Sequence, residues 1–233
     1  MDLFSTATDI LAIAIPVLIA ITTHEAAHGF VAHRLGDDTA YRLGRVTFNP
    51  FRHIDAFGTI LLPALLWFSF HFLFGWAKPV PVDFSRLHRP RRDMVLVAAA
   101  GPGVNLLLAI VSGFLLNLSG LIASGGIRDW LVGMFAISVV INVILAVFNM
   151  LPLPPLDGGR VAVGLLPDRL AFPLARLERW GLPIIIGVLF LIPWLAAQIG
   201  LGYNVSVFHR VIVPIVQFVV NIIGAITGTQ IAI

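Results

Sequence analysis

The chain alternates between long apolar stretches and short polar connections. Six apolar runs can be marked along it, at residues 9–33, 57–76, 94–118, 130–151, 182–201 and 207–228. Each run approaches or exceeds the ~20 residues that a helix needs to span the hydrocarbon of a bilayer. The pattern predicts an all-α polytopic membrane protein with five to six transmembrane helices. The connections are too short for a separate soluble domain, so we expect residues 1–233 to form one membrane-embedded domain.

Composition supports this prediction. Hydrophobic residues make up 58% of the 233 residues, and charged residues only 12%, where a soluble domain usually carries about 25%. The mean hydropathy is +0.96. The absence of cysteine excludes disulfides, thiolate metal ligands and cysteine nucleophiles. The net charge of +3 comes mainly from arginines in the connections, which is typical of a charge bias across a membrane and not of a nucleic-acid partner.

The basic residues also predict the topology. If all six runs span, the 15 lysines and arginines divide almost evenly between the two sides and decide nothing. If residues 57–76 instead leave on the side from which they enter, every basic residue except Arg128 and Arg210 lies on one side. The positive-inside bias favours this second arrangement. We therefore expect five spanning helices and a re-entrant segment at 57–76, with the N-terminus outside and the C-terminus in the cytoplasm.

The most informative polar residues lie inside the first apolar run. His24-Glu25-Ala26-Ala27-His28 places two histidines at positions i and i+4, on one helix face, where both can bind one metal ion. Glu25 is then placed to act on a water molecule instead of binding the ion. Such groups are costly at membrane depth and favour hydrolysis inside the membrane. A rise of about 1.5 Å per residue puts His28 roughly 9 Å from Arg34, near the predicted cytoplasmic end.

A third protein ligand is needed, because zinc is usually tetrahedral and keeps one position for water at a catalytic site. Asp157 is the best candidate, in the stretch Asn149-Met150-Leu151-Pro152-Leu153-Pro154-Pro155-Leu156-Asp157-Gly158-Gly159. The prolines end the run at 130–151, and irregular backbone at membrane depth must face protein or a wet cavity. The alternative is an ordinary Asp-Gly turn. We favour the ligand, because two histidines with metal-binding spacing lie elsewhere in the membrane.

With both motifs, the chain resembles the intramembrane zinc metalloproteases of the site-2 protease family, in the compact bacterial branch without a PDZ or CBS domain. The resemblance continues through residues 44–50, 53–59, 75–82 and 100–105 and covers roughly residues 20–160. It implies one Zn²⁺ per chain, held by His24, His28 and Asp157. It further implies that Glu25 is the general base, and that Asn149 has a catalytic role near the oxyanion or the peptide.

The resemblance also carries expectations about function. It implies a catalytic core at about residues 9–160, followed by two additional helices within 182–228. It implies an endopeptidase that cleaves transmembrane segments of single-pass proteins or peptides in the lipid bilayer of a bacterial plasma (inner) membrane. Release of a membrane-tethered regulator and clearance of signal-peptide remnants both stay open as its use. The sequence does not identify the substrate, the trigger or the oligomeric state.

Two connections are expected to be extended, at residues 41–48 and 78–84. We predict that they form a small β-hairpin on the cytoplasmic side, whose edge captures substrate as an added strand. The alternative is a purely structural hairpin, and we weigh the two equally. The substrate-binding residues of the first hypothesis are Val80, Pro81 and Val82.

Other polar residues have less specific interpretations. His53 precedes the re-entrant segment and is either part of the metal cavity, as a substrate-binding residue, or a hydrogen-bonding residue of its loop, which we favour. Asn105 and Asn142 are expected to join helices, not to catalyse.

Two functions compete with proteolysis. A transporter or channel would use the same histidines and aspartate for ions or protons, but the sequence shows no inverted repeats with matching broken helices. An inactive relative would bind membrane proteins without cutting them, and would have no use for Glu25.

Overall fold

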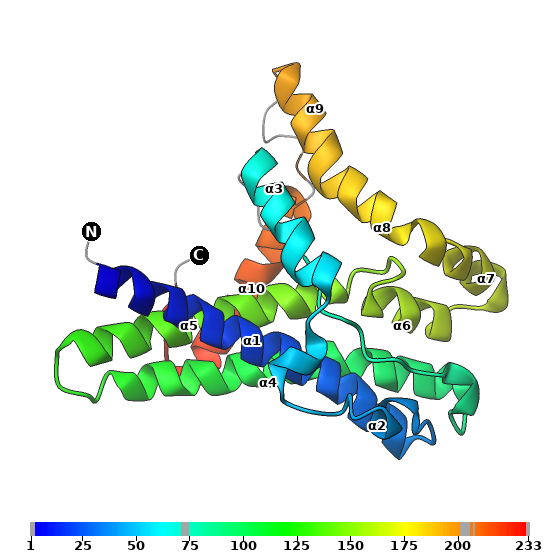
Figure 1. Ribbon diagram of the computed structural model, residues 1–233, viewed down its shortest axis with the longest axis horizontal. Coiled ribbons are helices and arrows are strands. Elements are labelled where there is room, and N and C mark those ends of the chain that lie inside the picture. Colours follow the sequence, from blue (N-terminus) through cyan, green and yellow to red (C-terminus); the bar gives the residue numbers. More distant parts are fainter. Residues whose placement is uncertain (1–2, 71–74, 201–205, 207, 232–233) are drawn as a thin grey trace.

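The computed structural model describes residues 3–70, 75–200, 206 and 208–231, and Figure 1 shows the arrangement of its helices. Within this part, five helical stretches are long and apolar enough to cross a membrane: Ala7–Arg34, Pro90–Ser119, Gly126–Asn149, Glu178–Gln198 and Phe208–Thr227. The number of candidate spanning helices in the described residues is therefore the predicted five. Residues 71–74, 201 and 207, which belong to predicted apolar runs, lie outside the described residues.

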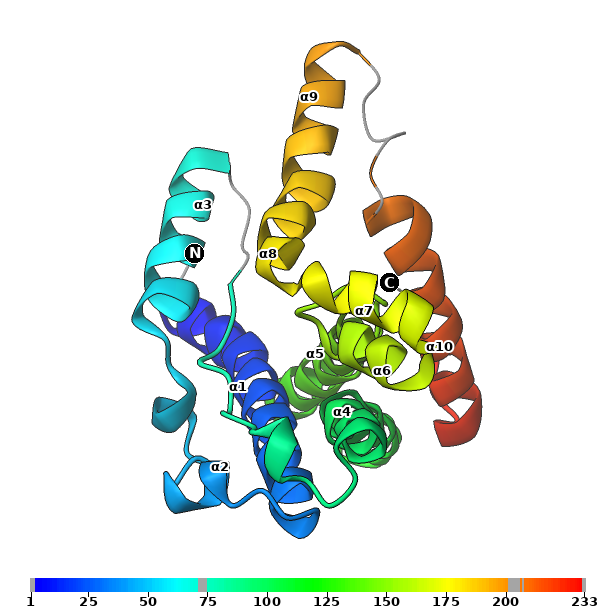
Figure 2. The same ribbon diagram turned by 90° about the vertical axis from the view of Figure 1, so that its right-hand side faces the viewer.

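These stretches correspond to the long helices of Figure 1. They are α1 (Leu3–Arg34), α4 (Pro90–Ser119), α5 (Gly126–Asn149), α8 (Glu178–Ile186) continued by the π-helical η4 (Gly187–Leu191) and α9 (Ile192–Gln198), and η6 (Phe208–Ile212) continued by α10 (Val213–Thr227). Helices α1, α4 and α5 run side by side at the centre, whereas α3 and α9 project away from them (Figure 2).

An apolar core joins α4, α5 and α10. Its buried residues are Ala109, Val139, Val143, Ile212, Val216, Val220 and Ile223. Close approach of α4 to α10 depends on Gly113, where a side chain would come within 2.8 Å of Thr227. This core fixes α4 and α5 relative to each other, and α1 packs against both.

Residues 56–70 lead away from the bundle (Figure 2), and residues 75 and 76 lie beside the start of that stretch. The chain runs through the π-helical η2 (Ala56–Leu61) and α3 (Leu62–Phe70), and the described part resumes at Gly75. The Trp76 N–H donates to the Gly58 carbonyl oxygen at 3.0 Å, and the Thr59 hydroxyl donates to the Trp76 carbonyl oxygen at 2.8 Å. The two ends therefore lie side by side, as the re-entrant prediction requires. Which side of a membrane they occupy stays a prediction.

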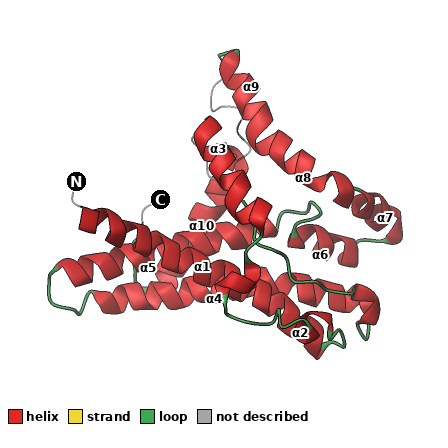
Figure 3. Ribbon diagram, viewed as in Figure 1, coloured by secondary structure: helices red, strands yellow, loops and turns green. Residues whose placement is uncertain are grey.

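The predicted β-hairpin is wrong. No strand occurs in the described part of the chain (Figure 3). Residues 41–48 begin in α2 (Thr39–Arg42) and continue through turns, and residues 78–83 are not part of any helix or strand. The physical reason lies in the second segment, because Pro79 and Pro81 have no N–H to donate to a ladder. Its other N–H groups bond mainly to side chains, as described below.

The turn between α5 and α6 (Asp157–Leu165) brings Asp157 back to the bundle. Helix α6 begins at Asp157 and packs against α4. Gly158 and Gly159 lie directly on the backbone of the turn, where side chains would overlap Met150 and Pro154. Helix α7 (Asp168–Arg176) follows and is tied to α4 by Arg91, which donates to the Asp168 carboxylate at 2.6 Å.

Candidate metal centre

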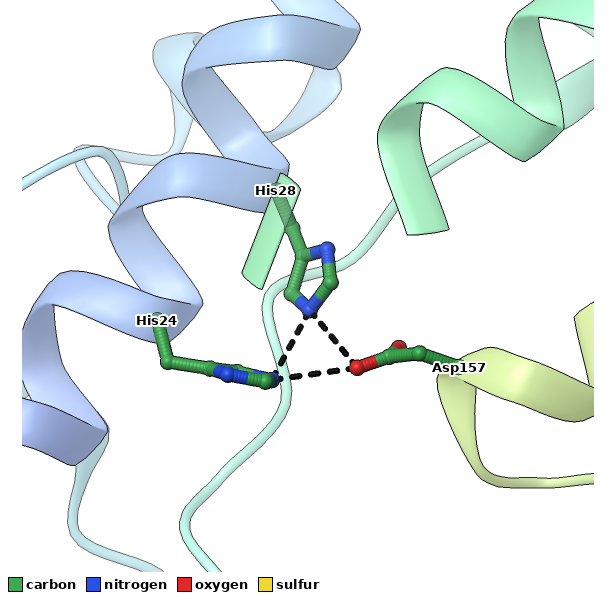
Figure 4. A group of neighbouring side chains, drawn as sticks. All are labelled: His24, His28 and Asp157. Atoms are coloured by element: carbon green, nitrogen blue, oxygen red, sulfur yellow. Dashed lines mark hydrogen bonds and ion pairs between the residues drawn. The ribbon is translucent and has the colours of Figure 1, made fainter. Parts of the chain in front are cut away.

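Three buried side chains converge at one point between α1 and α6 (Figure 4). The side chains of His24 and His28 project from α1, and the side chain of Asp157, the first residue of α6, points toward them. The two Nε2 atoms lie 3.0 Å apart, and Asp157 Oδ2 lies 3.1 Å from His24 Nε2 and 3.3 Å from His28 Nε2. The predicted ligand set is therefore brought together by residues more than 120 positions apart in the chain.

Hydrogen bonds on the far side of each imidazole determine which nitrogen faces the cluster. His24 Nδ1 lies 2.5 Å from Asn105 Oδ1, and His28 Nδ1 lies 2.7 Å from the Val97 carbonyl oxygen. Both partner oxygens are acceptors, so each neutral imidazole carries its proton on Nδ1. Both Nε2 atoms then face the cluster with lone pairs. A hydrogen bond of this kind is how proteins orient metal-binding histidines.

The centre of the cluster is thus lined by acceptors. Asp157 Oδ2 is buried and makes no geometrically acceptable hydrogen bond within the described part of the protein. Burial acts to raise the pKa of the Asp157 carboxyl, and a proton on the facing nitrogen of His24 or His28 would hold this pKa below its ordinary value. With both facing nitrogens unprotonated, a bound cation would take over that role and keep the carboxyl ionised, as a metal ligand must be.

A zinc ion fits this donor set. Three acceptors that face one another without a proton repel, and a cation between them removes the repulsion. With zinc–ligand distances of ~2.0–2.1 Å in a tetrahedron, ligand atoms lie roughly 3.3 Å apart. The distances of 3.0, 3.1 and 3.3 Å agree with that separation to within a few tenths of an ångström.

Gly101 of α4 covers the cluster. A side chain at this position would overlap His28 Nε2 and come within 2.6 Å of His24 Nε2. Gly101 and Asn105 are four residues apart on α4, so both lie on the helix face that packs against α1. Glycine therefore keeps the space beside the two ring nitrogens free for a bound ion and its remaining ligand.

Glu25 lies outside the ligand set and is held from another direction. Its Oε2 accepts a hydrogen bond of 2.8 Å from the backbone N–H of Val80. The side chain is half-buried, unlike the two flanking positions Ala26 and His24. This arrangement agrees with the expectation that Glu25 does not bind the metal.

Comparison with known proteins identifies the family. The profile described as "Peptidase family M50" matches residues 120–192, which include Asp157. A Bacillus subtilis (strain 168) protein named "Putative zinc metalloprotease YwhC" is 37% identical over 212 residues, which are 87% of this chain and 93% of that protein. The chain belongs to peptidase family M50. This is the site-2 protease family that its motifs resemble.

Other members of family M50 show a similar match. Proteins named "Putative zinc metalloprotease Rip2" are 31% identical over 174 residues in Mycolicibacterium smegmatis and 32% identical over 181 residues in Mycobacterium tuberculosis H37Rv. These matches cover 74% and 76% of this chain, and 64% and 66% of the two relatives. No solved structure matches the chain significantly.

Within the described part of this M50 chain, no hydrogen bond joins the other predicted site residues to the cluster. The Asn149 amide donates to the Leu145 carbonyl oxygen of its own helix. His53, which is buried, bonds through Nε2 to the Thr47 carbonyl oxygen, in line with the loop role we favoured. The catalytic role of Asn149 and the substrate-binding roles of His53, Val80, Pro81 and Val82 stay predictions.

Sequence reasoning missed part of the role of Asn105. We expected it to join helices, and its amide does donate to Asn142 Oδ1 at 2.9 Å and to the Ala20 carbonyl oxygen at 3.2 Å. Its oxygen in addition orients His24. The i, i+4 spacing of Gly101 and Asn105, which repeats the spacing of the two histidines, was the available signal.

Proposed function

We propose that this M50 peptidase is a membrane-embedded zinc endopeptidase that hydrolyses peptide bonds within transmembrane segments of other proteins. The observation that carries the proposal is the convergence of three buried acceptors, on His24, His28 and Asp157, beside an unligated Glu25. A transport or binding role would need the three acceptors but not the Glu25 carboxylate beside them. One Zn²⁺ per chain is the ion that this donor set and the relatives' names favour.

The reaction follows from the positions of these groups. Bound zinc supplies Lewis acidity, which lowers the pKa of a water molecule and polarises a peptide carbonyl. Glu25 accepts a proton from the attacking water as the new C–O bond forms. It then passes that proton to the leaving amine as the C–N bond breaks. We assign Asn149 to the stabilisation of the oxyanion or the peptide.

Substrates would be single-pass transmembrane proteins or peptides. The cluster lies on α1, near the end of the helix that the charge bias predicts to be cytoplasmic. A helical substrate hides its carbonyl groups in hydrogen bonds, so a stretch of it must unwind before attack. We propose that residues 80–82 pair with the unwound stretch, with His53 nearby. The Val82 N–H has no hydrogen-bond partner in the described structure, which supports this role.

The five apolar helices indicate a multi-pass membrane protein. We place it in the plasma (inner) membrane of a bacterium, as the bacterial relatives suggest. Release of a membrane-tethered regulator and clearance of signal-peptide remnants are both compatible with the site.

The test combines metal analysis with cleavage. The detergent-purified protein is compared with Glu25→Gln, His24→Ala and Asp157→Ala, and with Asp129→Ala as an exposed carboxylate control. We expect about one zinc per chain in the wild type, Glu25→Gln and Asp129→Ala, and little in the other two. A quenched fluorescent transmembrane peptide should be cleaved only by the wild type and Asp129→Ala. Cleavage by Glu25→Gln, or zinc that does not depend on Asp157, would overturn the proposal.

A further inference from the structure

We propose that Arg45 is a positioning residue for the reaction, acting through the segment 78–83, which we call the strap. Arg45 holds the strap against α1 so that the Val80 N–H fixes the Glu25 carboxylate in place for proton transfer. The inference rests on the proposed function, in which Glu25 is the base. Arg45 itself touches neither the metal ligands nor Glu25 by any hydrogen bond within the described residues.

The strap is anchored at both ends by groups outside it. At its start, the Lys78 N–H donates to the His53 carbonyl oxygen at 2.8 Å. Arg45 Nη2 donates to the carbonyl oxygens of Lys78 at 2.8 Å and Pro79 at 3.3 Å. At its end, the Asp83 N–H donates to Oδ2 of the fully buried Asp37 at 2.7 Å. The contact of Val80 with Glu25 lies between these two anchors.

The environment of Arg45 indicates that holding the strap is its purpose. The residue is only 9% exposed, and no carboxylate in the described part of the chain lies within ion-pair distance of it. Its Nε is buried and has no hydrogen-bond partner among the described residues. Burying an unpaired charge is costly, so a guanidinium in this position needs a specific reason. The two strap carbonyl oxygens are the partners its Nη2 finds.

Close contact between the strap and α1 depends on Gly29, one turn after Glu25. A side chain at Gly29 would lie 3.0 Å from Val80 Cγ1 and 2.9 Å from Val46 Cγ2. Val80 and Val46 belong to the strap and to the loop that carries Arg45. The same glycine therefore lets both reach the helix surface beside Glu25, independently of the hydrogen bonds.

Fixing Glu25 matters because the side chain is half-buried and has no other hydrogen-bond partner among the described residues. One carboxylate oxygen held by a backbone N–H leaves the other oxygen in a defined position for a proton. Misplacement of a reacting group by about 1 Å can reduce a rate roughly a hundredfold. Loss of the strap contact should therefore lower kcat while the zinc ligands stay in place.

The direct experiment removes the donor atom. Val80→Pro lacks the N–H, whereas Val80→Ala keeps the N–H and, like Val80→Pro, loses the branched valine side chain that packs beside Gly29. With a transmembrane peptide that the wild type cleaves, we expect kcat of Val80→Pro to be at least about tenfold below that of Val80→Ala. Zinc content should equal that of the wild type in both. Equal kcat values, or a difference confined to KM, would overturn the inference.

A second comparison tests Arg45 without using a substrate. Amide hydrogen exchange over residues 78–83 is measured in Arg45→Ala, Arg45→Lys and the control Arg42→Ala, whose side chain is 74% exposed. We expect faster exchange in Arg45→Ala, partial protection in Arg45→Lys, and wild-type protection in Arg42→Ala. Wild-type exchange in Arg45→Ala would show that Arg45 does not hold the strap.

The proposed function and the positioning role of Arg45 are separable by experiment. If Glu25→Gln cleaves as the wild type does, the proposed function fails. If Glu25→Gln is inactive but Val80→Pro turns over like Val80→Ala, only the positioning role fails. If Arg45→Ala does not fold, exchange in Arg45→Lys still tests the anchor, and the Val80 pair tests the contact with Glu25 that the anchor serves.

Discussion

Two faces of the same helix are held in contrasting ways. On one face of α1, His24 and His28 pack against α4, and their ring nitrogens bond to Asn105 and to the Val97 carbonyl oxygen. On the neighbouring face, Glu25 accepts its one hydrogen bond within the described residues from the strap, which belongs to no helix. The groups that would bind metal are thus fixed by the helical core, and the group that would move protons is fixed by irregular chain.

This difference predicts separable effects of mutation. Changes on the α4 side should alter zinc content or affinity, because they act on the ligands. Changes on the strap side should alter turnover or substrate binding and leave zinc unchanged. Local opening is easiest where backbone lies outside the packed core. The strap should therefore open locally more readily than α4 does.

The strongest test of the α4 side is Gly101→Ala. The added methyl group would overlap the two ring nitrogens, so we expect zinc content to fall from about one per chain to near zero, with loss of cleavage. Gly103→Ala is a matched control on the same helix, because a side chain there meets nothing within 4 Å. Metal analysis of both purified variants decides, and full zinc in Gly101→Ala would contradict the geometry.

Asn105→Ala should have a smaller effect of the same kind. Loss of the partner that orients His24 typically weakens metal binding about 10–100-fold. Asn142→Ala reaches His24 through its bond with Asn105 and should weaken metal binding less. Competition with a chelator measures both affinities, with Asn221→Ala as an exposed asparagine control. An affinity unchanged in Asn105→Ala would show that helix packing alone orients His24.

On the strap side, Val82→Pro tests the proposed pairing with substrate. Removing this free N–H should raise KM several-fold relative to Val82→Ala, about the effect of one net hydrogen bond of ~1 kcal/mol. The zinc content should be unchanged in both. A fall in kcat at constant KM would instead mean that Val82 shares the positioning role we assign to Val80.

The smallest effect is expected far from both faces, at Arg91. Its ion pair with Asp168 is exposed, and such pairs contribute less than about 1 kcal/mol. Asp168→Ala removes this pair and leaves the Arg91 bonds to the Gly164 and Leu166 carbonyl oxygens, so it should lower thermal stability slightly without changing zinc content or kcat. Thermal unfolding in the same detergent provides the measurement, and a large loss of zinc would show that α7 supports the position of α6.

Much of the zinc-binding face could be predicted from the sequence, because its signals are local. The i, i+4 spacing of the histidines and the proline-rich turn before Asp157 each show in a few consecutive residues. The uneven arginine distribution likewise predicted that residues 57–76 return. The strap face could not be predicted in this way. Its contacts join Arg45 and Glu25 to residues 33 and 55 positions away, and no local pattern encodes them.

The incorrect prediction of a β-hairpin has the same cause, namely contacts between residues far apart in the sequence. Valine and proline in residues 78–84 favour extended backbone, and that much is compatible with the structure. Extended backbone becomes a strand only when it finds a partner, and the partners here are the side chains of Glu25, Asp37 and Arg45. Only the helix-joining role of Asn105 was predicted, for a related reason. An amide can donate through its nitrogen and accept through its oxygen, and the sequence shows only that Asn105 lies in an apolar run.

The length of α1 couples the site to the surrounding lipid. Its 32 residues extend about 48 Å at 1.5 Å per residue, whereas bilayer hydrocarbon is ~30 Å thick. The helix must therefore tilt or project from the hydrocarbon, and hydrophobic mismatch sets how much of each occurs. A thicker bilayer would draw the histidine pair further from the water that hydrolysis consumes. The access of water to the metal site therefore depends on the protein and on the lipid acyl chains that surround it.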